Sequence, residues 1–346
     1  MIAKAKSKST ISDVARLSGV SKKTVSRVIN NSPNVGVDTR AKVLKVMESL
    51  NYLPSPQARG LAARRSFQLG LVYDNPDPLY IDAIQRGVLG ICGPAGYDLV
   101  VHPCDYSSRR LVDDIRLFID RSRVDGVVIL PPVSELQHVA DALTEAGHRY
   151  VRLASAAIDD PRHIVVSDER SGVERLAEYF VKQGHTRIGF IFGPKKFLSA
   201  TERYQGFREG LRKHGLTLSP EYVVEGAYDF DSGKQCAEKL LSQNPPPTAI
   251  FASNDDMAAG VIHVAADRGV QIPQQLSVAG FDDSKLASLL LPSLTTVKRP
   301  VRQMAAVAAE KLIEAIGRGD EAANGSLTVM QPEIVLRAST GPCPDK

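Results

Sequence analysis

A dense group of hydrogen-bonding side chains lies within nine residues near the N-terminus. Its members are Lys22, Lys23, Thr24, Ser26, Arg27 and Asn30. Lysine and arginine can donate to guanine acceptors or to phosphates, asparagine can bridge adenine, and threonine offers both a hydroxyl and a methyl group. The group therefore suits the edges of base pairs in DNA, whereas each cation taken alone suits a phosphate or the solvent equally well.

Helical spacing of apolar residues surrounds this group. Thr10 precedes Asp13 by three positions, which is typical of a helix N-terminus, and a first helix is predicted to follow. Gly19 suits a tight turn, after which a second helix is predicted over 22–30 and a third over 38–50. Two helices joined by a short glycine-containing turn are typical of the helix-turn-helix, whose second helix enters the major groove of DNA.

The distribution of charge favours a polyanionic partner for this end of the chain. The sequence of 346 residues has a formal net charge of +4. Residues 1–65 hold 13 Lys and Arg against three acidic residues, so the remaining chain is mildly acidic. A small basic module on an acidic body is typical of proteins that bring one end to a nucleic acid. A solvated basic tail is the alternative, but such tails do not usually carry helical apolar periodicity.

Length and composition are those of an ordinary globular protein with two or three domains. Hydrophobic residues make up 43% and charged residues 24% of the sequence, and no segment approaches the roughly 20 apolar residues of a membrane span. No export signal is evident, so we expect a cytoplasmic protein without a membrane partner. Four scattered cysteines and seven dispersed histidines lack the spacing of a metal site, and we expect neither a metal nor a cofactor.

From residue 69 onward, short β-branched runs alternate with helical segments. The expected strands lie near 69–73, 99–101, 126–130, 164–166, 188–192, 249–251 and 276–281. The expected helices lie near 79–95, 109–121, 134–146, 171–183, 200–214, 232–243, 256–268 and 300–316. The fold class is therefore α/β, with an N-terminal all-α helix-turn-helix domain and two doubly wound α/β subdomains built on parallel sheets. A ligand cleft is expected between the subdomains, at the carboxyl ends of the strands.

Enzymes such as dehydrogenases and kinases also use doubly wound sheets, so we searched the sequence for their characteristic motifs to test whether this chain is an enzyme. The chain holds no G-x-G-x-x-G after the first strand, no G-x-x-x-x-G-K-[ST] and no G-x-S-x-G. We therefore expect no catalysis and no catalytic residues. A solute-binding protein without a role on DNA is a second alternative, but it would need an export signal and would not need the basic N-terminal module.

The N-terminal residues resemble the DNA-binding signature of the LacI/GalR repressor family. The likeness is carried by Thr10-Ile-Ser-Asp-Val-Ala, by Gly19-Val-Ser-Lys-Lys-Thr-Val-Ser-Arg-Val-Ile-Asn, by Thr39-Arg-Ala-Lys-Val and by Leu50-Asn-Tyr-Leu-Pro. This resemblance implies a sequence-specific, ligand-controlled regulator of transcription. The predicted DNA-contacting residues are Thr10, Lys22, Lys23, Thr24, Ser26, Arg27, Asn30 and Leu61.

Residues 55–66 resemble the family's hinge, which becomes a short helix on DNA. Leu61 matches the family's wedge residue. The resemblance implies that Leu61 from each of two subunits enters the minor groove and unstacks a central base step. A plain basic linker is the alternative for this segment.

The body of the chain resembles the family's core, which is similar to a periplasmic sugar-binding protein. The likeness is carried by Val165-Val-Ser-Asp-Glu-Arg-Ser-Gly, Glu202-Arg-Tyr-Gln-Gly-Phe, Ala252-Ser-Asn-Asp-Asp-Met-Ala and Val278-Ala-Gly-Phe-Asp-Asp. Glu169 departs from the pattern, since many members have Asn there. The resemblance implies effector contacts from Arg203, Tyr228, Asn254 and Asp282, and Asp74 is a further candidate because it follows the first predicted strand at its carboxyl end. Phe230 is a rival for the aromatic position, and each polar residue has a helix cap or a surface ion pair as its alternative role.

Together these patterns predict a homodimeric repressor that binds a palindromic operator in double-stranded DNA and is released by a small sugar-like effector, a mono- or disaccharide. A regulator whose effector tightens DNA binding stays open as an alternative. The expected domains are residues 1–54 for DNA binding, 55–66 for the hinge and 67–346 for effector binding and dimerisation. Within the last domain we expect the chain to cross between subdomains near 155–167, 282–292 and 318–328.

Overall fold

The computed structural model describes residues 9–29, 34–50, 52, 65–75, 77–318 and 325–344. The chain divides into two compact units, residues 1–67 and residues 68–346. Two of the predicted DNA-contacting residues, Asn30 and Leu61, lie outside the described residues.

Across the described part of the chain, no helix combines the length and the apolar character needed to cross a membrane.

The described part of the N-terminal unit contains three helices, α1 (Ile11–Ser18), α2 (Lys22–Ile29) and α3 (Val37–Ser49). Local side chains determine where the first two begin. Thr10 and Asp13 form a capping box in which the Asp13 carboxylate accepts from the Thr10 backbone at 3.0 Å. Gly19 ends α1 in the left-handed conformation with φ +66°, and the Ser21 hydroxyl accepts from the Thr24 backbone at 3.1 Å. The predicted pair of helices and the glycine turn between them are confirmed.

A small apolar core holds these helices together. Its buried members come from all three helices and are Val14, Ala15, Val25, Val28 and Val43. Val25 and Val28 are three positions apart, so they share one face of α2. The opposite face of α2 is left to solvent.

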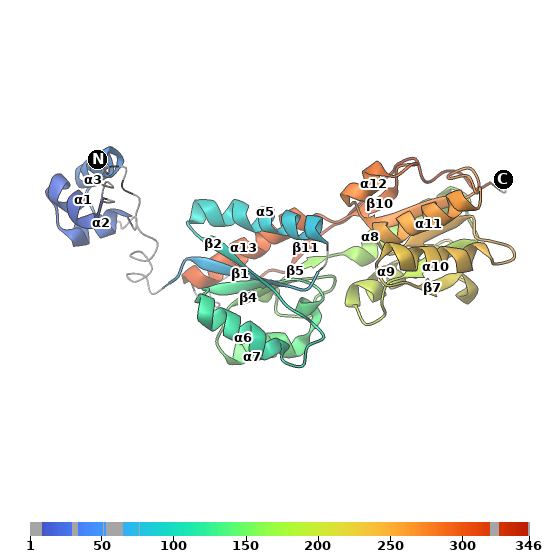
Figure 1. The fold of residues 1–346 in the computed structure, drawn as a ribbon, viewed down its shortest axis with the longest axis horizontal. Helices are drawn as coiled ribbons and strands as arrows, with labels where there is room; N and C mark the ends of the chain where they lie inside the picture. Colours follow the sequence, from blue (N-terminus) through green and yellow to red (C-terminus); the bar gives the residue numbers. More distant parts are fainter. Residues whose placement is uncertain are drawn as a thin grey trace, which may run out of the picture. The chain divides into compact units, whose positions relative to one another are not determined.

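Two six-stranded sheets form the body of the chain (Figure 1). The first sheet has the order β11 (Thr328–Met330), β5 (Ile164–Ser167), β4 (Tyr150–Ala154), β3 (Gly126–Ile129), β1 (Gln68–Tyr73) and β2 (Asp98–Pro103). The second has the order β12 (Glu333–Val335), β10 (Thr295–Lys298), β9 (Ser277–Asp282), β8 (Ala249–Ala252), β6 (Ile188–Phe192) and β7 (Val223–Glu225). Neighbouring strands are parallel, except that β12 runs antiparallel to β10.

Helices cover both faces of each sheet, so the predicted doubly wound subdomains are confirmed. On the first sheet, the helices on one face are α5 (Pro78–Ala95) and α13 (Val301–Arg318), and those on the other are α6 (Leu111–Ser122) and α7 (Gln137–Glu145) (Figure 1). On the second sheet, the paired helices are α8 (Glu169–Lys182) with α9 (Leu198–Arg212), and α10 (Phe230–Leu241) with α11 (Asp255–Asp267). The shorter helices are η1 (Val133–Glu135), η2 (Pro161–His163), η3 (Pro220–Tyr222) and α12 (Lys285–Leu289).

The chain passes between the two subdomains three times, later than the sequence patterns placed these crossings. The first crossing follows β5 at Asp168, the second lies at 299–300 between β10 and α13, and the third at 331–332 between β11 and β12. The expected ranges 155–167, 282–292 and 318–328 each end too early. The physical reason is that β5, β10 and β11 pair with their own sheet before the chain leaves it.

Candidate effector cleft and DNA-reading helix

The outer face of α2 carries most of the side chains predicted to contact DNA. Those that are exposed or partly buried on this helix are Lys22, Lys23, Thr24, Ser26 and Arg27. The Thr24 hydroxyl lies 2.9 Å from the Ser21 hydroxyl at the start of the helix. Thr10 is exposed as well, but its side chain caps α1. The helix therefore presents hydrogen-bond donors to solvent on the side opposite its apolar core.

A cleft of about 960 Å³ lies between the two subdomains of the second unit. Its volume falls in the range of small-molecule sites. It lies at the carboxyl ends of the parallel strands, where Asp74 follows β1, Asn254 follows β8 and Asp282 ends β9. Arg203 from α9 and Tyr228 from the loop after β7 also line it. The structure thus brings all five candidate effector-contacting residues into one cavity.

Close packing of α9 on α8 positions Arg203. A Cβ at Gly206 or at Gly210 would collide with a backbone carbonyl of α8, so glycine at both positions lets the two helices touch. The buried Arg203 Nε then donates to the Glu169 carboxylate at 2.7 Å, and its Nη1 donates to the Ser253 carbonyl. Burial has the largest single effect and lowers the pKa of Arg203, but Glu169, Tyr228 and Asp282 together outweigh it and the pKa is raised. The guanidinium is fixed as a cation.

A second arginine, Arg299, lies beside the first and was not predicted from the sequence. It sits at the second crossing between subdomains, where its Nη2 lies 2.6 Å from Asp282 Oδ1 and its Nη1 donates to Glu169 Oε1 at 3.3 Å. Its pKa is raised because the Asp282 and Glu169 carboxylates outweigh the effect of burial. Arg203, Arg299 and Asp282 line the cleft, and Glu169, which lines a small adjoining cavity, joins them into a floor of alternating charges in the order Arg203, Glu169, Arg299 and Asp282.

Three residues of the cleft adopt the left-handed backbone region that favours glycine. Tyr228 has φ +67°, Asp282 has φ +110° and Asp283 has φ +54°. Such conformations cost on the order of 1–3 kcal/mol each and persist only where surrounding contacts hold them. Asp282 is held by Arg299, and Asp283 by Arg337 at 2.6 Å. Backbone strain is thus concentrated where ligand contacts are expected.

Asn254 and Tyr228 form one unit. The Asn254 side chain caps α11 by accepting from the Met257 backbone at 3.0 Å, and its amide donates to the Tyr228 carbonyl at 2.9 Å. The Tyr228 ring packs directly over Gly193 and stacks on Phe197 with centroids 6.0 Å apart. Asn254 therefore has the helix-cap role that was weighed as its alternative, and it also holds the aromatic residue in place.

Asp74 and Phe230 differ in how well they suit the cleft. Asp74 lines it, and its carboxylate accepts from the Tyr106 backbone at 2.9 Å. Phe230 begins α10 instead and packs against His263 with ring centroids 5.5 Å apart. The structure favours Tyr228 over Phe230 as the aromatic side chain of the cleft.

Asp255 follows Asn254, lines the cleft and is largely buried against Gly280. Its carboxylate accepts from the Thr296 hydroxyl at 2.6 Å and from the Ser284 backbone at 2.7 Å. Burial, together with the nearby Asp282 carboxylate, raises the pKa of Asp255 to about 7. Asp255 therefore titrates near neutrality.

Two family models match the chain. One is described as bacterial regulatory proteins, lacI family, and matches residues 10–55, and the other is a periplasmic binding protein-like domain that matches residues 177–340. Catabolite control protein A of Priestia megaterium is 32% identical over 332 residues, which cover 96% of this chain and 99% of that protein. The chain belongs to the LacI family. It is a DNA-binding regulator of transcription, as the sequence predicted.

Further relatives and solved structures agree with this assignment. The HTH-type transcriptional regulator DegA of Bacillus subtilis (strain 168) is 32% identical and covers 97% of this chain and 99% of its own length. The Lac repressor dimer bound to operator and the anti-inducer ONPF has a TM-score of 0.76 at 27% identity, over 96% of this chain and 99% of that one. The regulator CelR in complex with cellobiose has a TM-score of 0.71 at 28% identity, over the same shares.

In this LacI-family core, a hydrogen bond of Glu135 joins the two subdomains across the cleft, and the rings of Tyr106 and Phe197 also meet there with centroids 5.7 Å apart. Glu135, the last residue of η1, accepts from the Leu198 backbone at 2.9 Å, where α9 begins. The positive end of the α9 dipole favours a carboxylate at this place. Burial nevertheless raises the pKa of Glu135. The contact links a turn of the first subdomain to the helix that carries Arg203.

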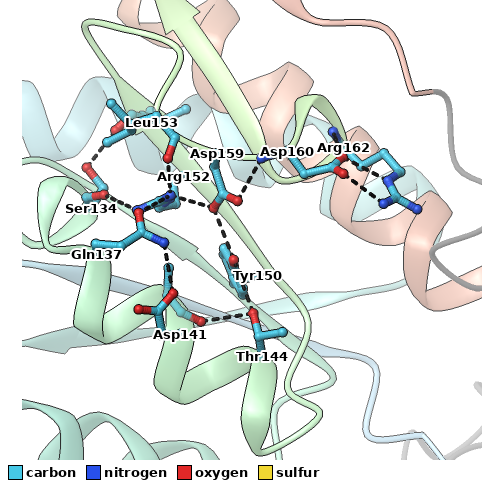
Figure 2. A network of polar contacts seen from close by, with 12 residues as sticks. Ser134, Gln137, Asp141, Thr144, Tyr150, Arg152, Leu153, Asp159, Asp160 and Arg162 are labelled. Atoms are coloured by element: carbon cyan, nitrogen blue, oxygen red, sulfur yellow. Dashed lines mark hydrogen bonds and ion pairs between the residues drawn. The ribbon is translucent and has the colours of Figure 1, made fainter.

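A buried polar network anchors the turn that presents Glu135 (Figure 2). At its centre Arg152 of β4 donates to the Ser134 carbonyl at 3.1 Å and pairs with Asp159 at 2.6 Å. Figure 2 shows Gln137 and Tyr150 on either side of this pair, and the Tyr150 hydroxyl donates to Asp159 at 3.0 Å. Because Ser134 precedes Glu135, the network fixes the position of the carboxylate at the cleft.

Sequence reasoning missed Arg299 and Glu135, and it noted Glu169 only as a departure from the family pattern. Arg299 follows a strand of four residues, and Glu135 lies in a 3₁₀ turn, so neither belongs to a long periodic element. The available signal was Glu169, a carboxylate three positions after the end of the predicted strand 164–166. Such a residue is expected at the ligand-binding edge of a parallel sheet.

Proposed function

We propose that this LacI-family regulator is a homodimeric repressor that binds a palindromic operator and releases it when a mono- or disaccharide occupies the cleft. The observation that supports this most directly is the convergence of Arg203, Asp282 and Tyr228 in one cavity. A guanidinium and a carboxylate each make charge-assisted hydrogen bonds to vicinal hydroxyl groups. An aromatic ring adds an apolar surface for the C–H faces of a sugar.

Within each half-site of the operator, the helix α2 and the hinge residue Leu61 are proposed to contact different grooves of the DNA. The N-terminal side chains of α2 reach base edges, with Lys22 and Lys23 setting operator preference, while Leu61 from each subunit enters the minor groove. One helix-turn-helix makes few base contacts, and a two-fold dimer pairs naturally with a palindrome. The solved Lac repressor, a structural neighbour, is a dimer on its operator. Since its operator is in the cytoplasm, we place the protein there.

Within the cleft, Arg203 and Asp282 are proposed to bind hydroxyl groups and Tyr228 to stack on the sugar. Asp74 contributes a carboxylate from the first subdomain. Asn254 acts chiefly through Tyr228, because both polar groups of its amide already bind backbone atoms. The CelR regulator, a structural neighbour, has been solved with cellobiose.

We propose that the effector controls DNA binding because it has different affinities for different arrangements of the two subdomains. An effector that binds one arrangement of the two subdomains more tightly shifts the population toward it. The Glu135 contact at the start of α9 is formed in one such arrangement. If the operator selects another, ligand and DNA compete through their coupling free energy, and the ligand acts as an inducer.

Selection of bound sequences from random DNA tests this function, performed with the full chain and repeated with a panel of mono- and disaccharides. We expect a palindrome to be enriched and at least one sugar to weaken binding to it. An Arg203→Ala variant serves as the control, because it should keep operator binding and lose the response to sugar. Enrichment without symmetry, or a monomer in sedimentation both free and on DNA, would contradict the proposal. A sugar that tightens binding would reverse the direction of control.

A further inference from the structure

Glu169 bridges the two buried arginines of the cleft. Its side chain is only 2% exposed, and its two carboxylate oxygens face different partners. Oε2 accepts from Arg203 at 2.7 Å, and Oε1 accepts from Arg299 at 3.3 Å. The carboxylate thus lies between the two guanidinium groups and already pairs with both, as an anion bound to the two arginines would have to do.

The surroundings prevent the arginines from turning away. The Arg203 guanidinium lies 3.7 Å from the centroid of the Phe281 ring, and the Arg299 guanidinium lies 5.8 Å from the same ring. Arg299 also lies 5.4 Å from the centroid of Tyr80. Both cations are therefore sandwiched between carboxylates and aromatic rings, so their positions and charges are set before a ligand arrives.

The charges on the cleft floor cancel. Arg203 and Arg299 contribute two positive charges, and Glu169 and Asp282 contribute two negative ones. The residues that line the wider cleft include nine with carboxylate side chains and five with basic side chains. An anionic ligand would therefore find no net positive charge on the floor and would be repelled by the carboxylates of the cleft walls. This electrostatic repulsion is strong in a site of low dielectric constant.

We infer that Glu169 is a specificity-determining residue that makes the cleft accept a polyhydroxylated ligand without an anionic group and reject carboxylate- or phosphate-bearing relatives of that ligand. This inference rests on the proposed effector function of the cleft. Hydroxyl groups need only single hydrogen bonds, and Arg203 keeps N–H groups beyond the two that bind Glu169 and the Ser253 carbonyl. A ligand carboxylate would instead compete with Glu169 for the same donors, and the buried Glu169 would be left without its partner.

Neutralising Glu169 is expected to turn the floor into an anion site. In Glu169→Gln the two arginines face only Asp282, which leaves one net positive charge between rigid guanidinium groups. Glu178→Gln is the matched control, since it makes the same substitution on the same helix at a carboxylate that pairs with Lys213 instead. Glu169→Asp keeps the charge and serves as the conservative variant.

The experiment has two arms, both on full-length protein. Calorimetry measures Kd for matched pairs that differ by oxidation at C6 of one ring, which are glucose with glucuronate, galactose with galacturonate, and cellobiose with cellobiouronate. Thermal unfolding measures the change in Tm with millimolar sodium sulfate against sodium chloride at equal ionic strength. We expect the wild type, Glu178→Gln and Glu169→Asp to prefer the neutral member of any pair that binds and to show the same small response to sulfate.

For Glu169→Gln we expect the ratio of affinities to shift toward the anion by at least tenfold, and sulfate to raise Tm more than it does in the other proteins. An unchanged ratio and an unchanged sulfate response would overturn the inference. The inference would also be overturned if the wild type bound glucuronate or galacturonate more tightly than the matching neutral sugar. This measurement uses the wild type alone, so it does not depend on whether a variant folds. If no sugar binds the wild type, the proposed effector class fails, while the sulfate arm still decides the role of Glu169.

Discussion

The cations of α2 and the arginines of the cleft are similar chemical groups in opposite surroundings. Lys22, Lys23 and Arg27 are exposed, whereas Arg203 and Arg299 are enclosed by carboxylates and aromatic rings. Exposed cations release counterions from DNA, so their contribution falls as salt rises. Buried and paired cations have fixed positions, so they recognise a small ligand by geometry. Charge acts as attraction in the first unit and as positioning in the second.

The largest expected effect comes from removing one of the two buried arginines of the cleft. Arg203→Ala removes a buried cation from its pair with Glu169, which should weaken binding of a sugar effector by about 100-fold and lower the free energy of unfolding by about 3–5 kcal/mol. Denaturant unfolding and calorimetry measure these effects. Arg208→Ala on the same helix removes an exposed arginine and should change stability by less than about 0.5 kcal/mol. Equal effects of the two substitutions would contradict a positioning role for Arg203.

The next effect concerns Asp255, whose pKa is raised from 3.8 to about 7 in the folded protein. Below pH 4 the carboxyl is protonated in both states and contributes nothing. Between about pH 4 and 7 the unfolded chain loses the proton while the folded chain keeps it, so stability falls as pH rises. Asp255→Asn should remove this fall, which amounts to at most about 4 kcal/mol.

Unfolding free energies at a series of pH values measure the slope for Asp255. Asp267→Asn is the control, because it lies on the same helix with a side chain that is 68% exposed. A slope that persists unchanged in Asp255→Asn would show that another group is responsible.

On the exposed side, Arg27→Ala should weaken operator binding by about 1–3 kcal/mol and leave the unfolding free energy nearly unchanged. A phosphate contact predicts a uniform loss across DNA sequences and a salt slope smaller by about one, whereas a base contact predicts relaxed specificity at one position. Fluorescence anisotropy at several salt concentrations separates the two. Arg16→Ala, which removes an exposed arginine of α1, should leave DNA affinity within about twofold. If Arg27→Ala lowered the free energy of unfolding as much as Arg203→Ala does, the exposed arginine would have a structural role, which would contradict its proposed role in DNA binding.

The smallest effect is expected for Glu135→Gln. A carboxylate at a helix N-terminus is worth about 0.3–1 kcal/mol, so the substitution should weaken effector binding by about two- to fivefold. Affinity for operator without effector should change by no more than a similar factor. Glu145→Gln, at the exposed end of α7, is the control. A loss of effector binding as large as that in Arg203→Ala would mean that Glu135 contacts the ligand itself.

The sequence alone determined the architecture of the N-terminal unit. Thr10, Asp13, Gly19 and Ser21 act on atoms within a few positions of themselves, and valines at helical spacing form the core. The contacts that set the ends of the first two helices are therefore local. The long helices of the body and most of its strands follow from the same local periodicity. Strands β4, β7, β10, β11 and β12 escaped prediction, because β7, β11 and β12 have only three residues each, Arg152 interrupts the apolar run of β4, and Val297 is the one aliphatic residue of β10.

Only the tertiary structure decided how the cleft works. Glu169 and Arg299 are 130 positions apart in the chain, and no local pattern says that they meet. The resemblance pointed to Arg203, Tyr228, Asn254 and Asp282 as cleft residues, but the packing of α9 on α8 and the crossing after β10 determine which charges neutralise which. A helix cap is decided by neighbours in sequence, so it can be read from sequence. A charge balance inside a cleft is decided by neighbours in space, so it requires the fold.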